Sequence, residues 1–343
     1  MLSNNINNLK IWLNANNISF IENYDLKNKS WIKAGGIIKT FITPDTEEKA
    51  IIIVKYLFEN NIKFYVLGNL SNVLIRDGDI LTPIINLNKL STIKQISKNS
   101  LNFSVQAGTP ISRFAIFFTK KNIYGVQGLV GIPGNIGGGI YMNSSSYNSC
   151  ISDYIDNITV ISKDGKLETL NKIEANFAWR YSKFHIEPKV ILKAEFHFPK
   201  ECLNHNSNLN EMLTKIKNHR NTFQEKKYPN LGSTFATRNI YKDISKVSFI
   251  YFIIYLLNKI FSLVFSKMPT NTFLNYRKTV IKIYSIFLKI DKKSKYGFSN
   301  RTLNCIVNHG STSSNDAISL IRNLQNKFKK TNRLENIILD DIK

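Results

Sequence analysis

Glycine is concentrated in one stretch of this chain. Residues 125–147, GVQGLVGIPGNIGGGIYMNSSSY, hold seven of the sixteen glycines and place Pro133 between two of them. Glycine reaches backbone angles that other residues avoid, and it lets backbone N–H groups come close to a bound group. The stretch therefore predicts a tight turn whose amides face an anion such as a phosphate. Its spacing matches neither the GxGxxG nor the GxxxxGK pattern, so close packing of a turn without a ligand is the alternative.

Two earlier segments also place glycine between apolar runs. In residues 64–77, FYVLGNLSNVLIRD, two apolar runs flank residues 68–72, which predicts a strand, a turn and a second strand with amides and small polar side chains at the tip. An ordinary hairpin turn is the alternative there. In residues 28–42, NKSWIKAGGIIKTFI, Gly35 and Gly36 interrupt strand-like runs.

Together these motifs resemble the UDP-N-acetylenolpyruvoylglucosamine reductase family, flavoenzymes of peptidoglycan precursor synthesis. GLVGIPGNIGG, followed by Asn143 and Tyr147, is similar to the family's GIPG and N-x-G-A-Y region. Residues 68–72 are similar to the L-G-G-G-S-N-x-L loop, which binds the flavin pyrophosphate. NKSWIKAGG matches N-T-F-x-x-G-G in part. The resemblance covers residues 29–238 well and 300–343 loosely.

The resemblance implies a bound FAD that NADPH reduces. We expect non-covalent FAD, because neither glycine loop has a histidine or cysteine beside it to attack the flavin. Asn69 and Leu70 replace two glycines of the family, and leucine does not readily adopt positive φ. The cofactor-binding residues implied are Gly35, Gly36, Gly68, Asn69, Ser71, Asn72, Gly131, Ile132, Pro133, Gly134, Asn135, Gly137 and Asn143.

Two further motifs carry candidate catalytic residues. FAWRYSKF, residues 177–184, resembles F-x-Y-R-x-S-x-F, which implies that Arg180 binds the carboxylate of the enolpyruvyl group. Aromatic neighbours would orient its guanidinium fork, whereas a lone loop arginine is usually a solvated surface residue. YPNLGSTF, residues 228–235, resembles P-N-A-G-S-x-F, which implies that Ser233 delivers a proton to carbon. A Gly-Ser pair by itself is typical of any loop, and proton delivery by serine requires a desolvated setting.

The tail TNRLENIILDDIK resembles the family's terminal L-E-x-E-V strand, whose second glutamate acts at the substrate. The register that we prefer matches Leu334 and Glu335 to the first two letters and places Ile337 on that glutamate. Glu335, two residues earlier on the same strand face, could take the role only if the strand ended early or bulged. We therefore list Glu335 as the third catalytic candidate and expect weak or altered reductase activity.

The fold class that follows is α+β. The spacing of apolar residues predicts an N-terminal helix within residues 1–19. The resemblance implies a two-lobed FAD-binding fold of the vanillyl-alcohol oxidase or PCMH type over residues 20–200. Residues 201–343 would form a C-terminal α/β substrate-binding domain with a helical insert at residues 239–298.

Composition limits the remaining possibilities. Lys and Arg total 47 against 24 Asp and Glu, so the formal charge of +23 favours polyanions, although compositional bias alone would produce it. We predict no nucleic-acid partner. Cys150, Cys202 and Cys305 are far apart and the five histidines show no ligand spacing, so we expect neither a disulfide framework nor a metal site. The first residues lack the pattern of an export signal, which favours a cytoplasmic protein.

The insert contains the most apolar segment of the chain. Residues 247–265, VSFIYFIIYLLNKIFSLVF, approach membrane-spanning length but carry Asn258 and Lys259 near the middle. A buried helix, a contact between copies and contact with a membrane surface through residues 247–266 are all compatible with this pattern. We predict that the helix does not span a bilayer.

The expected function is therefore FAD-dependent, NADPH-driven reduction of the enolpyruvyl group of UDP-N-acetylglucosamine enolpyruvate to UDP-N-acetylmuramate. One alternative is a flavin-dependent oxidoreductase of the same fold that acts on another nucleotide sugar in surface-polysaccharide synthesis. Another is a flavin-binding protein without turnover.

Overall fold

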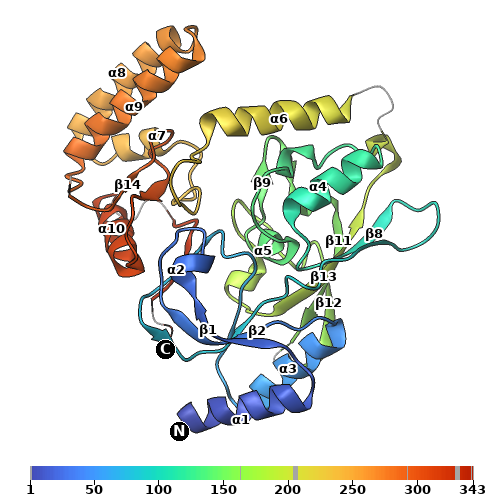
Figure 1. Ribbon diagram of the computed structural model, residues 1–343. Coiled ribbons are helices and arrows are strands. Elements are labelled where there is room, and N and C mark those ends of the chain that lie inside the picture. Colours follow the sequence, from blue (N-terminus) through green and yellow to red (C-terminus); the bar gives the residue numbers. More distant parts are fainter. Residues whose placement is uncertain are drawn as a thin grey trace.

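The structure is a computed structural model that describes residues 2–162, 164–203, 208–291, 293–328, 333–340 and 342. Two sheet-containing lobes lie beside a C-terminal part that is mostly helical (Figure 1). The α+β class is thus confirmed. Helix α1 (Leu2–Ala15) forms where the apolar spacing predicted it, with Leu9 and Leu13 fully buried. Its Trp12 stacks on Tyr56 at 4.1 Å between ring centroids.

The first lobe is built on a sheet with the strand order β1-β2-β6-β3, and β5 also pairs with β2. Only the β1–β2 pair is antiparallel. The strands are β1 (Phe20–Asp25), β2 (Ile37–Ile42), β3 (Tyr65–Val66), β5 (Asp79–Ile80) and β6 (Ile84–Ile85). The short helix α2 (Leu26–Lys29) follows β1, and α3 (Glu47–Glu59) begins after Thr46, whose side chain accepts a hydrogen bond from the Lys49 amide.

The second lobe is an antiparallel sheet with the order β12-β11-β13-β8-β7. The strands are β7 (Ile93–Gln95), β8 (Asn102–Gln106), β11 (Ile155–Ile161), β12 (Leu167–Asn171) and β13 (Val190–His197). Helix α4 (Ile111–Lys120) packs on it through edge-on phenylalanine contacts, such as Phe103 with Phe118 at 4.9 Å. A turn at Gly165, with φ +75°, joins β11 to β12. Helix α5 (Ile136–Tyr141) and the short strand β9 (Ser145–Ser146) lie in the glycine-rich stretch, and β10 (Ser149–Cys150) follows it.

Among the described residues of the C-terminal part, four α-helices precede the strands β14 and β15. They are α6 (Leu209–Phe223), α7 (Ile240–Ser245), α8 (Phe249–Phe265) and α9 (Thr270–Phe287). Strands β14 (Tyr296–Phe298) and β15 (Ile306–Asn308) form a hairpin, followed by α10 (Ser314–Lys327) and β16 (Ile337–Leu339). The sequence predicts that the last helix reaches Lys330, a residue outside the described ranges. Among the described residues, no helix has both the length and the apolar character needed to cross a membrane.

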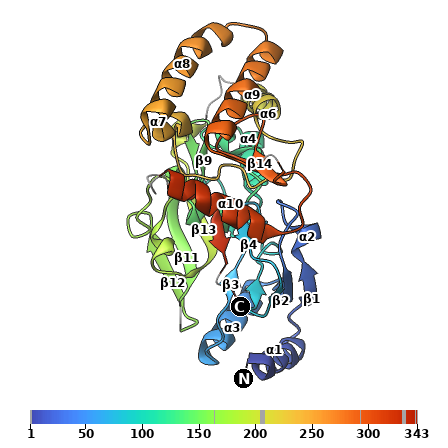
Figure 2. The same ribbon diagram turned by 90° about the vertical axis from the view of Figure 1, so that its left-hand side faces the viewer.

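Two elements of the C-terminal part pack against the two lobes. Helix α6 contributes Leu213 and Ile216 to the large core that includes the second lobe. Strand β16 pairs in parallel with β4 (Val73–Ile75), which directly follows the turn at residues 68–72. The chain thus returns at its end to the first lobe, and the division at residue 200 stays a prediction. Figure 2 shows α10 lying across this junction.

Candidate functional site

A cleft with a volume of about 1620 Å³ lies where the two lobes and the C-terminal part meet. The turn at residues 68–72, the glycine-rich loop at residues 131–139, Arg180, Ser233 and Glu335 all contribute to its walls. Residues that are more than 250 positions apart in the sequence therefore share one cavity. It brings together most of the residues that the motifs singled out.

The turn at residues 68–72 is not a hairpin turn. The strand before it, β3, pairs with β6, and the strand after it, β4, pairs with β16. Among the described residues, none of the five amides from Gly68 to Asn72 donates a hydrogen bond within the chain. Backbone amides without an internal acceptor require an external one, and here that acceptor would come from the cleft.

The loop at residues 131–135 faces this turn and is fastened to it. The Asn69 side-chain amide donates to the Pro133 carbonyl at 2.6 Å. The amides of Gly134 and Asn135 donate no hydrogen bond within the described part of the chain. The side-chain oxygen of Asn135 is buried without a partner there, and a Cβ on Gly68 would lie 2.9 Å from it. The two loops thus present free amides to a common space in which a phosphate group fits.

Leu70 adopts a positive φ angle, which is an unfavourable backbone conformation for leucine. Its φ is +53°, in the left-handed region, at a cost of about 1–2 kcal/mol for a residue with a Cβ. The side chain is buried against the core of the first lobe. Burial of a leucine contributes about 1.5–3 kcal/mol and so offsets the strain, which explains how leucine is accommodated at a glycine position of the family.

Three predicted cofactor-binding residues, Gly35, Gly36 and Asn143, do not line the cleft, and their role in cofactor binding stays a prediction. The Gly36 amide donates to the Arg76 carbonyl, and a Cβ on Gly36 would lie 1.9 Å from the Gly78 carbonyl oxygen. Gly35, with φ +126°, packs against Leu26. These two glycines therefore serve the close contact of two backbone segments. Asn143 donates to the Ala178 carbonyl at 2.9 Å and so positions the segment that carries Arg180.

Arg180 and Glu335 form an ion pair in the cleft. Arg180 Nε lies 3.0 Å from Glu335 Oε1, and the two side chains are 17% and 18% exposed. The Nε–H bond is not directed at that oxygen and finds no hydrogen-bond acceptor among the described residues. The guanidinium lies 5.1 Å from the Trp179 ring centroid. Arg180 is therefore oriented by charge and by stacking, while its N–H groups can still bind a carboxylate.

The backbone of Arg180 is strained and held from outside. Its φ is +52°, a rare value for a residue with a long side chain. Arg333 fixes this conformation. One of its side-chain nitrogens donates to the carbonyls of Trp179 and Arg180 at 2.7 Å each. Strain that the surroundings maintain is typical of functional sites.

Glu335 lies before the last strand and not within it, contrary to the strand register expected from the sequence. Strand β16 begins at Ile337, and the chain bends at Glu335 and Asn336. The Glu335 amide donates to the Thr234 carbonyl, and its own carbonyl accepts from Asn72 at 2.8 Å. The alternation of side chains along a strand therefore does not apply to Glu335. Ile337 pairs with Val73 and packs against the core of the first lobe.

The surroundings of Glu335 make its carboxyl group easier to protonate than that of an exposed glutamate. Burial raises the pKa of Glu335 above its ordinary value, while Arg180 and Arg333 act in the opposite direction without cancelling that effect. Ser233 is linked to this segment, since the side-chain amide of Asn336, the residue after Glu335, donates a hydrogen bond to the Ser233 carbonyl at 3.1 Å. The Ser233 side chain is exposed in the cleft, so the chain alone does not provide the desolvated setting that proton delivery requires.

Sequence reasoning missed Arg220. This residue of α6 is only 6% exposed and lines the cleft. It donates to the Gly128 carbonyl at 3.1 Å and to the Ser146 hydroxyl at 2.7 Å, and its guanidinium lies 5.0 Å from the Tyr147 ring centroid. Burial lowers the pKa of Arg220. A Cβ on Gly131 would lie 2.9 Å from the Arg220 side chain, so Gly131 was the one sequence signal of the contact between these two residues.

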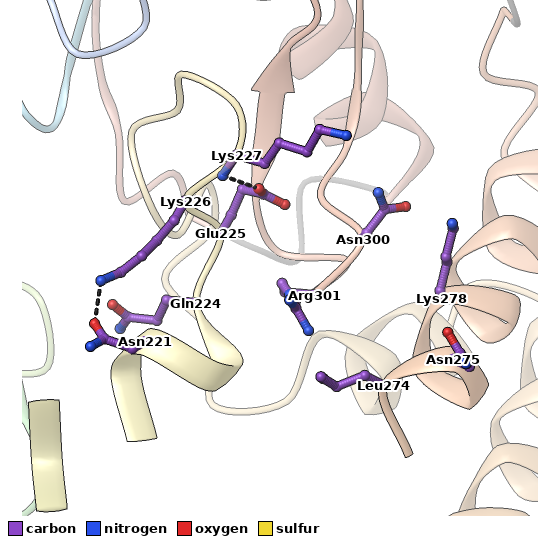
Figure 3. A pocket seen from close by; sticks show the side chains of 10 residues that line it. All are labelled: Asn221, Gln224, Glu225, Lys226, Lys227, Leu274, Asn275, Lys278, Asn300 and Arg301. Carbon is purple, nitrogen blue, oxygen red and sulfur yellow. Dashed lines mark hydrogen bonds between the residues drawn. The ribbon is translucent and has the colours of Figure 1, made fainter. Parts of the chain in front are cut away.

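A smaller pocket of about 380 Å³ adjoins the cleft (Figure 3). It lies between the loop after α6, one face of α9 and residues 300–301, and residues 224–227 belong to both cavities. Four basic residues surround it, namely Lys226, Lys227, Lys278 and Arg301. Glu225 accepts hydrogen bonds from the Lys227 amide and the Ser299 hydroxyl at 2.8 Å each, so its negative charge is engaged. The pocket therefore favours an anion.

The described residues contain no group of three or more His, Cys, Asp or Glu that could hold a metal ion. Cys150, Cys202 and Cys305 are free. Cys305 and His185 line the cleft. Burial raises the pKa of Cys305 to about 12, so its thiol stays protonated at neutral pH, and His185 stacks on Tyr141 at 4.1 Å.

Comparisons with known proteins agree with this geometry. Residues 38–171 match the family profile of a FAD binding domain, and this range includes both amide-lined loops. The fold is similar to that of the crystal structure of UDP-N-acetylenolpyruvylglucosamine reductase from Thermus caldophilus. That likeness has a TM-score of 0.63 and covers 94% of this chain and 98% of the other at 20% identity. The two-lobed fold expected from the sequence is thereby confirmed.

Curated relatives extend the similarity to the sequence. The UDP-N-acetylenolpyruvoylglucosamine reductase of Clostridium tetani is 33% identical over 210 residues, which are 61% of this chain and 66% of that protein. The enzyme of the same name from Listeria monocytogenes serovar 1/2a is 31% identical over 213 residues, 62% of this chain and 70% of that protein. The matched region thus spans about two thirds of these relatives. The chain belongs to the UDP-N-acetylenolpyruvoylglucosamine reductase family.

Proposed function

We propose that this protein reduces the enolpyruvyl group of UDP-N-acetylglucosamine enolpyruvate with electrons from NADPH and a bound FAD. The observation that carries the proposal is the Arg180–Glu335 ion pair, which opens into the same cleft as two loops with free amides. The named activity of the relatives supports it. The product, UDP-N-acetylmuramate, would place the reaction in cytoplasmic peptidoglycan precursor synthesis and hence in cell wall biogenesis.

The residues present fit a flavin dinucleotide. The free amides of residues 68–72 and of Gly134 and Asn135 would bind the pyrophosphate, with Ser71 and Asn72 at the same turn. Gly68 and Gly131 leave space where a side chain would intrude. The attachment would be non-covalent, since the cysteine of the cleft is protonated and its histidine is stacked between tyrosines.

Bound FAD would supply the two-electron reduction of the substrate double bond. An alkene attached to a carboxylate accepts those electrons only if the charge that develops on the carboxylate side is neutralised. Arg180 would bind that carboxylate through its free N–H groups, and Ser233 would deliver a proton to the carbon next to it. Substrate that fills the cleft would exclude water from Ser233.

Glu335 would act beside Arg180 as the family's second glutamate does at the substrate. The preferred sequence register had placed Ile337 at that position. The bend before β16 supports this, because it places the Glu335 carboxyl group at Arg180 and leaves Ile337 on a strand in contact with the first lobe. A carboxyl group whose pKa is raised takes up a proton more readily than an exposed glutamate, which suits a part in proton transfer beside Ser233. We accordingly propose full reductase activity.

The UDP part of the substrate would bind toward the smaller pocket. Lys226 and Lys227 line both cavities, and Lys278 and Arg301 add positive charge beyond them. A diphosphate carries the negative charge that these side chains would attract.

The visible spectrum of the purified protein tests this function. We expect a flavin spectrum that NADPH bleaches under anaerobic conditions and that UDP-N-acetylglucosamine enolpyruvate restores. Restoration by another nucleotide sugar in a panel, and not by this one, would instead support the alternative oxidoreductase. A spectrum that bleaches but is restored by no sugar would support a flavin-binding protein without turnover.

A further inference from the structure

The hairpin of α8 and α9 exposes a large apolar surface. None of the seventeen residues of α8 is buried, and ten large apolar side chains between Phe249 and Val264 are at least 38% exposed. With about 100° between successive residues of a helix, these ten side chains cover roughly half of the circumference. No charged residue lies within that half, because Lys259 is at its edge. Single exposed apolar residues are common, but a continuous surface of this kind marks an interaction site.

The opposite face of α8 is already covered by α9. Tyr276 of α9 donates to the Asn258 carbonyl and side-chain oxygen at 2.9 and 2.6 Å. The Phe265 and Tyr276 rings stack at 4.5 Å, and the Tyr251 hydroxyl donates to the Phe287 carbonyl at 3.1 Å. The polar groups of α8 therefore serve the contact with α9, and the apolar half faces outward. Both views show the hairpin at one end of the molecule, away from the two sheets (Figures 1 and 2).

The charge of the hairpin has one sign. Residues 247–290 contain six basic residues and no aspartate or glutamate. Five of them are exposed lysines, namely Lys259, Lys267, Lys278, Lys282 and Lys289. An apolar helix face with lysines beside it is typical of helices that lie in the interface of a membrane with anionic lipids.

We propose that the α8–α9 hairpin binds the surface of an anionic lipid bilayer. Helix α8 would lie in the plane of the interface, with its apolar half among the acyl chains near the headgroups and the lysines at the anionic headgroups. Insertion across the bilayer would carry the lysines of α9 into hydrocarbon along with α8. A contact between two copies through this face would bring two hairpins of like charge together without an acidic residue on either to pair with. The proposal goes beyond the proposed function and does not depend on it.

Flotation of the full-length protein with lipid vesicles tests the proposal. We expect the protein to float with vesicles that contain phosphatidylglycerol and phosphatidylcholine, and to remain unbound with phosphatidylcholine alone. High salt should release it, because lysine–headgroup attraction is screened. Absence of binding to the phosphatidylglycerol vesicles, or binding that resists both high salt and carbonate, would overturn the proposal.

Matched variants separate the two parts of the interaction. Replacing Phe249, Ile260 and Leu263 with serine should weaken vesicle binding at least about tenfold, because apolar area no longer enters the interface. The control replaces three exposed isoleucines outside the hairpin with serine, namely Ile11, Ile96 and Ile173, and should bind like the parent. Far-ultraviolet circular dichroism of each variant verifies folding.

A charge series completes the test. Replacing Lys259, Lys267 and Lys282 with glutamate should also reduce binding at least about tenfold. The control makes the same change of charge at Lys94, Lys98 and Lys120, three exposed lysines of the second lobe, and should retain most binding. Equal loss in both charge variants would show binding through net charge alone and overturn the proposal. Self-association of the parent that the serine variant abolishes, without any vesicle binding, would assign the face to a contact between copies.

Discussion

Arg180 and Leu70 both adopt φ angles in the left-handed region, +52° and +53°. Each conformation costs of order 1–3 kcal/mol, and each is maintained by contacts from elsewhere in the chain. Arg333 holds the Arg180 backbone, and the core of the first lobe holds the Leu70 side chain. Both residues line the cleft. The two strained residues thus lie where the chain presents a guanidinium group and a row of amides to the cleft.

Arg180→Lys should reduce turnover about 10²-fold while flavin binding stays near the parent value. An ammonium group cannot reproduce the two-point contact of a guanidinium with a carboxylate, and loss of one such stabilising contact costs about this factor. Steady-state NADPH oxidation and flavin titration measure the two quantities. Arg322→Lys, at an exposed arginine that pairs with Asp340, is the control and should behave like the parent. Equal turnover of both variants would contradict the role of Arg180.

Glu335→Gln should change how stability depends on pH. The folded-state pKa of Glu335 is raised above its ordinary value of 4.5, so the folded protein binds more protons than the unfolded chain above that pH. The parent therefore loses stability as pH rises through this window, and a glutamine variant lacks that loss. The free energy of unfolding of the variant, relative to the parent, should increase from pH 4.5 upward in denaturant titrations. A difference between variant and parent that stays constant with pH would contradict the raised pKa.

At the scale of elements, Asp77 joins the first lobe to α10. Its carboxylate accepts hydrogen bonds from the Ser313 hydroxyl, the Ser314 amide and hydroxyl, and the Asn315 amide, at 2.7 to 3.2 Å. Burial opposes ionisation, but these hydrogen bonds outweigh it and hold the pKa of Asp77 below its ordinary value. The helix N-terminus adds a favourable field for a negative charge.

Asp77→Asn should lower the free energy of unfolding by about 1 kcal/mol at neutral pH, the contribution of hydrogen bonds to a partly exposed charged group. Because the pKa of Asp77 is lowered in the folded state, its contribution is present above the ordinary Asp pKa and is lost as pH falls through the folded-state value. The difference between variant and parent should therefore shrink below about pH 4. Denaturant titrations at several pH values measure it. Asp79→Asn, at an exposed pair with Lys39, serves as control, and an effect no larger than that control would contradict the role of Asp77.

Local sequence predicted the elements but not how distant elements meet. The glycine loops and the N-terminal helix followed from turn chemistry and periodicity, which are local properties. At Gly35 and Gly36 the sequence could not separate close backbone packing from ligand contact, and their contacts with Leu26 and Gly78 become visible only in the fold. Arg220 was missed because an arginine on a helix gives no sign of burial. The bend at Glu335 depends on hydrogen bonds with Asn72 and Thr234, more than 100 residues away in the sequence.

At the scale of the whole molecule, the last strand contributes to the cleft by pairing with a strand of the first lobe. Strand β16 pairs with β4, and Asn336 donates to the side chain of Asn72 at 2.8 Å. These contacts place Glu335 beside the turn at residues 68–72. Cofactor binding and the folding of the C-terminal part are therefore coupled, since a ligand that binds only the folded state stabilises it.

We expect the flavin to be bound without a covalent attachment and therefore to be released when acid precipitates the protein. Acid precipitation should leave the yellow colour in the supernatant, because the thiol of Cys305 is protonated and His185 is stacked between aromatic rings. Absorbance of the supernatant and the redissolved pellet measures the distribution. Colour that stays in the pellet would show a covalent bond.

Separate measurement of the two half-reactions by stopped-flow absorbance tests the central claim, that Arg180 and Glu335 serve the reduction of an enolpyruvyl carboxylate. In the parent, NADPH should bleach the flavin and UDP-N-acetylglucosamine enolpyruvate should restore its absorbance. In Glu335→Gln, bleaching by NADPH should proceed near the parent rate, while restoration by the substrate should be about 10² to 10⁴ times slower, the usual contribution of a positioned group that takes part in proton transfer. Restoration at the parent rate in Glu335→Gln would contradict the account.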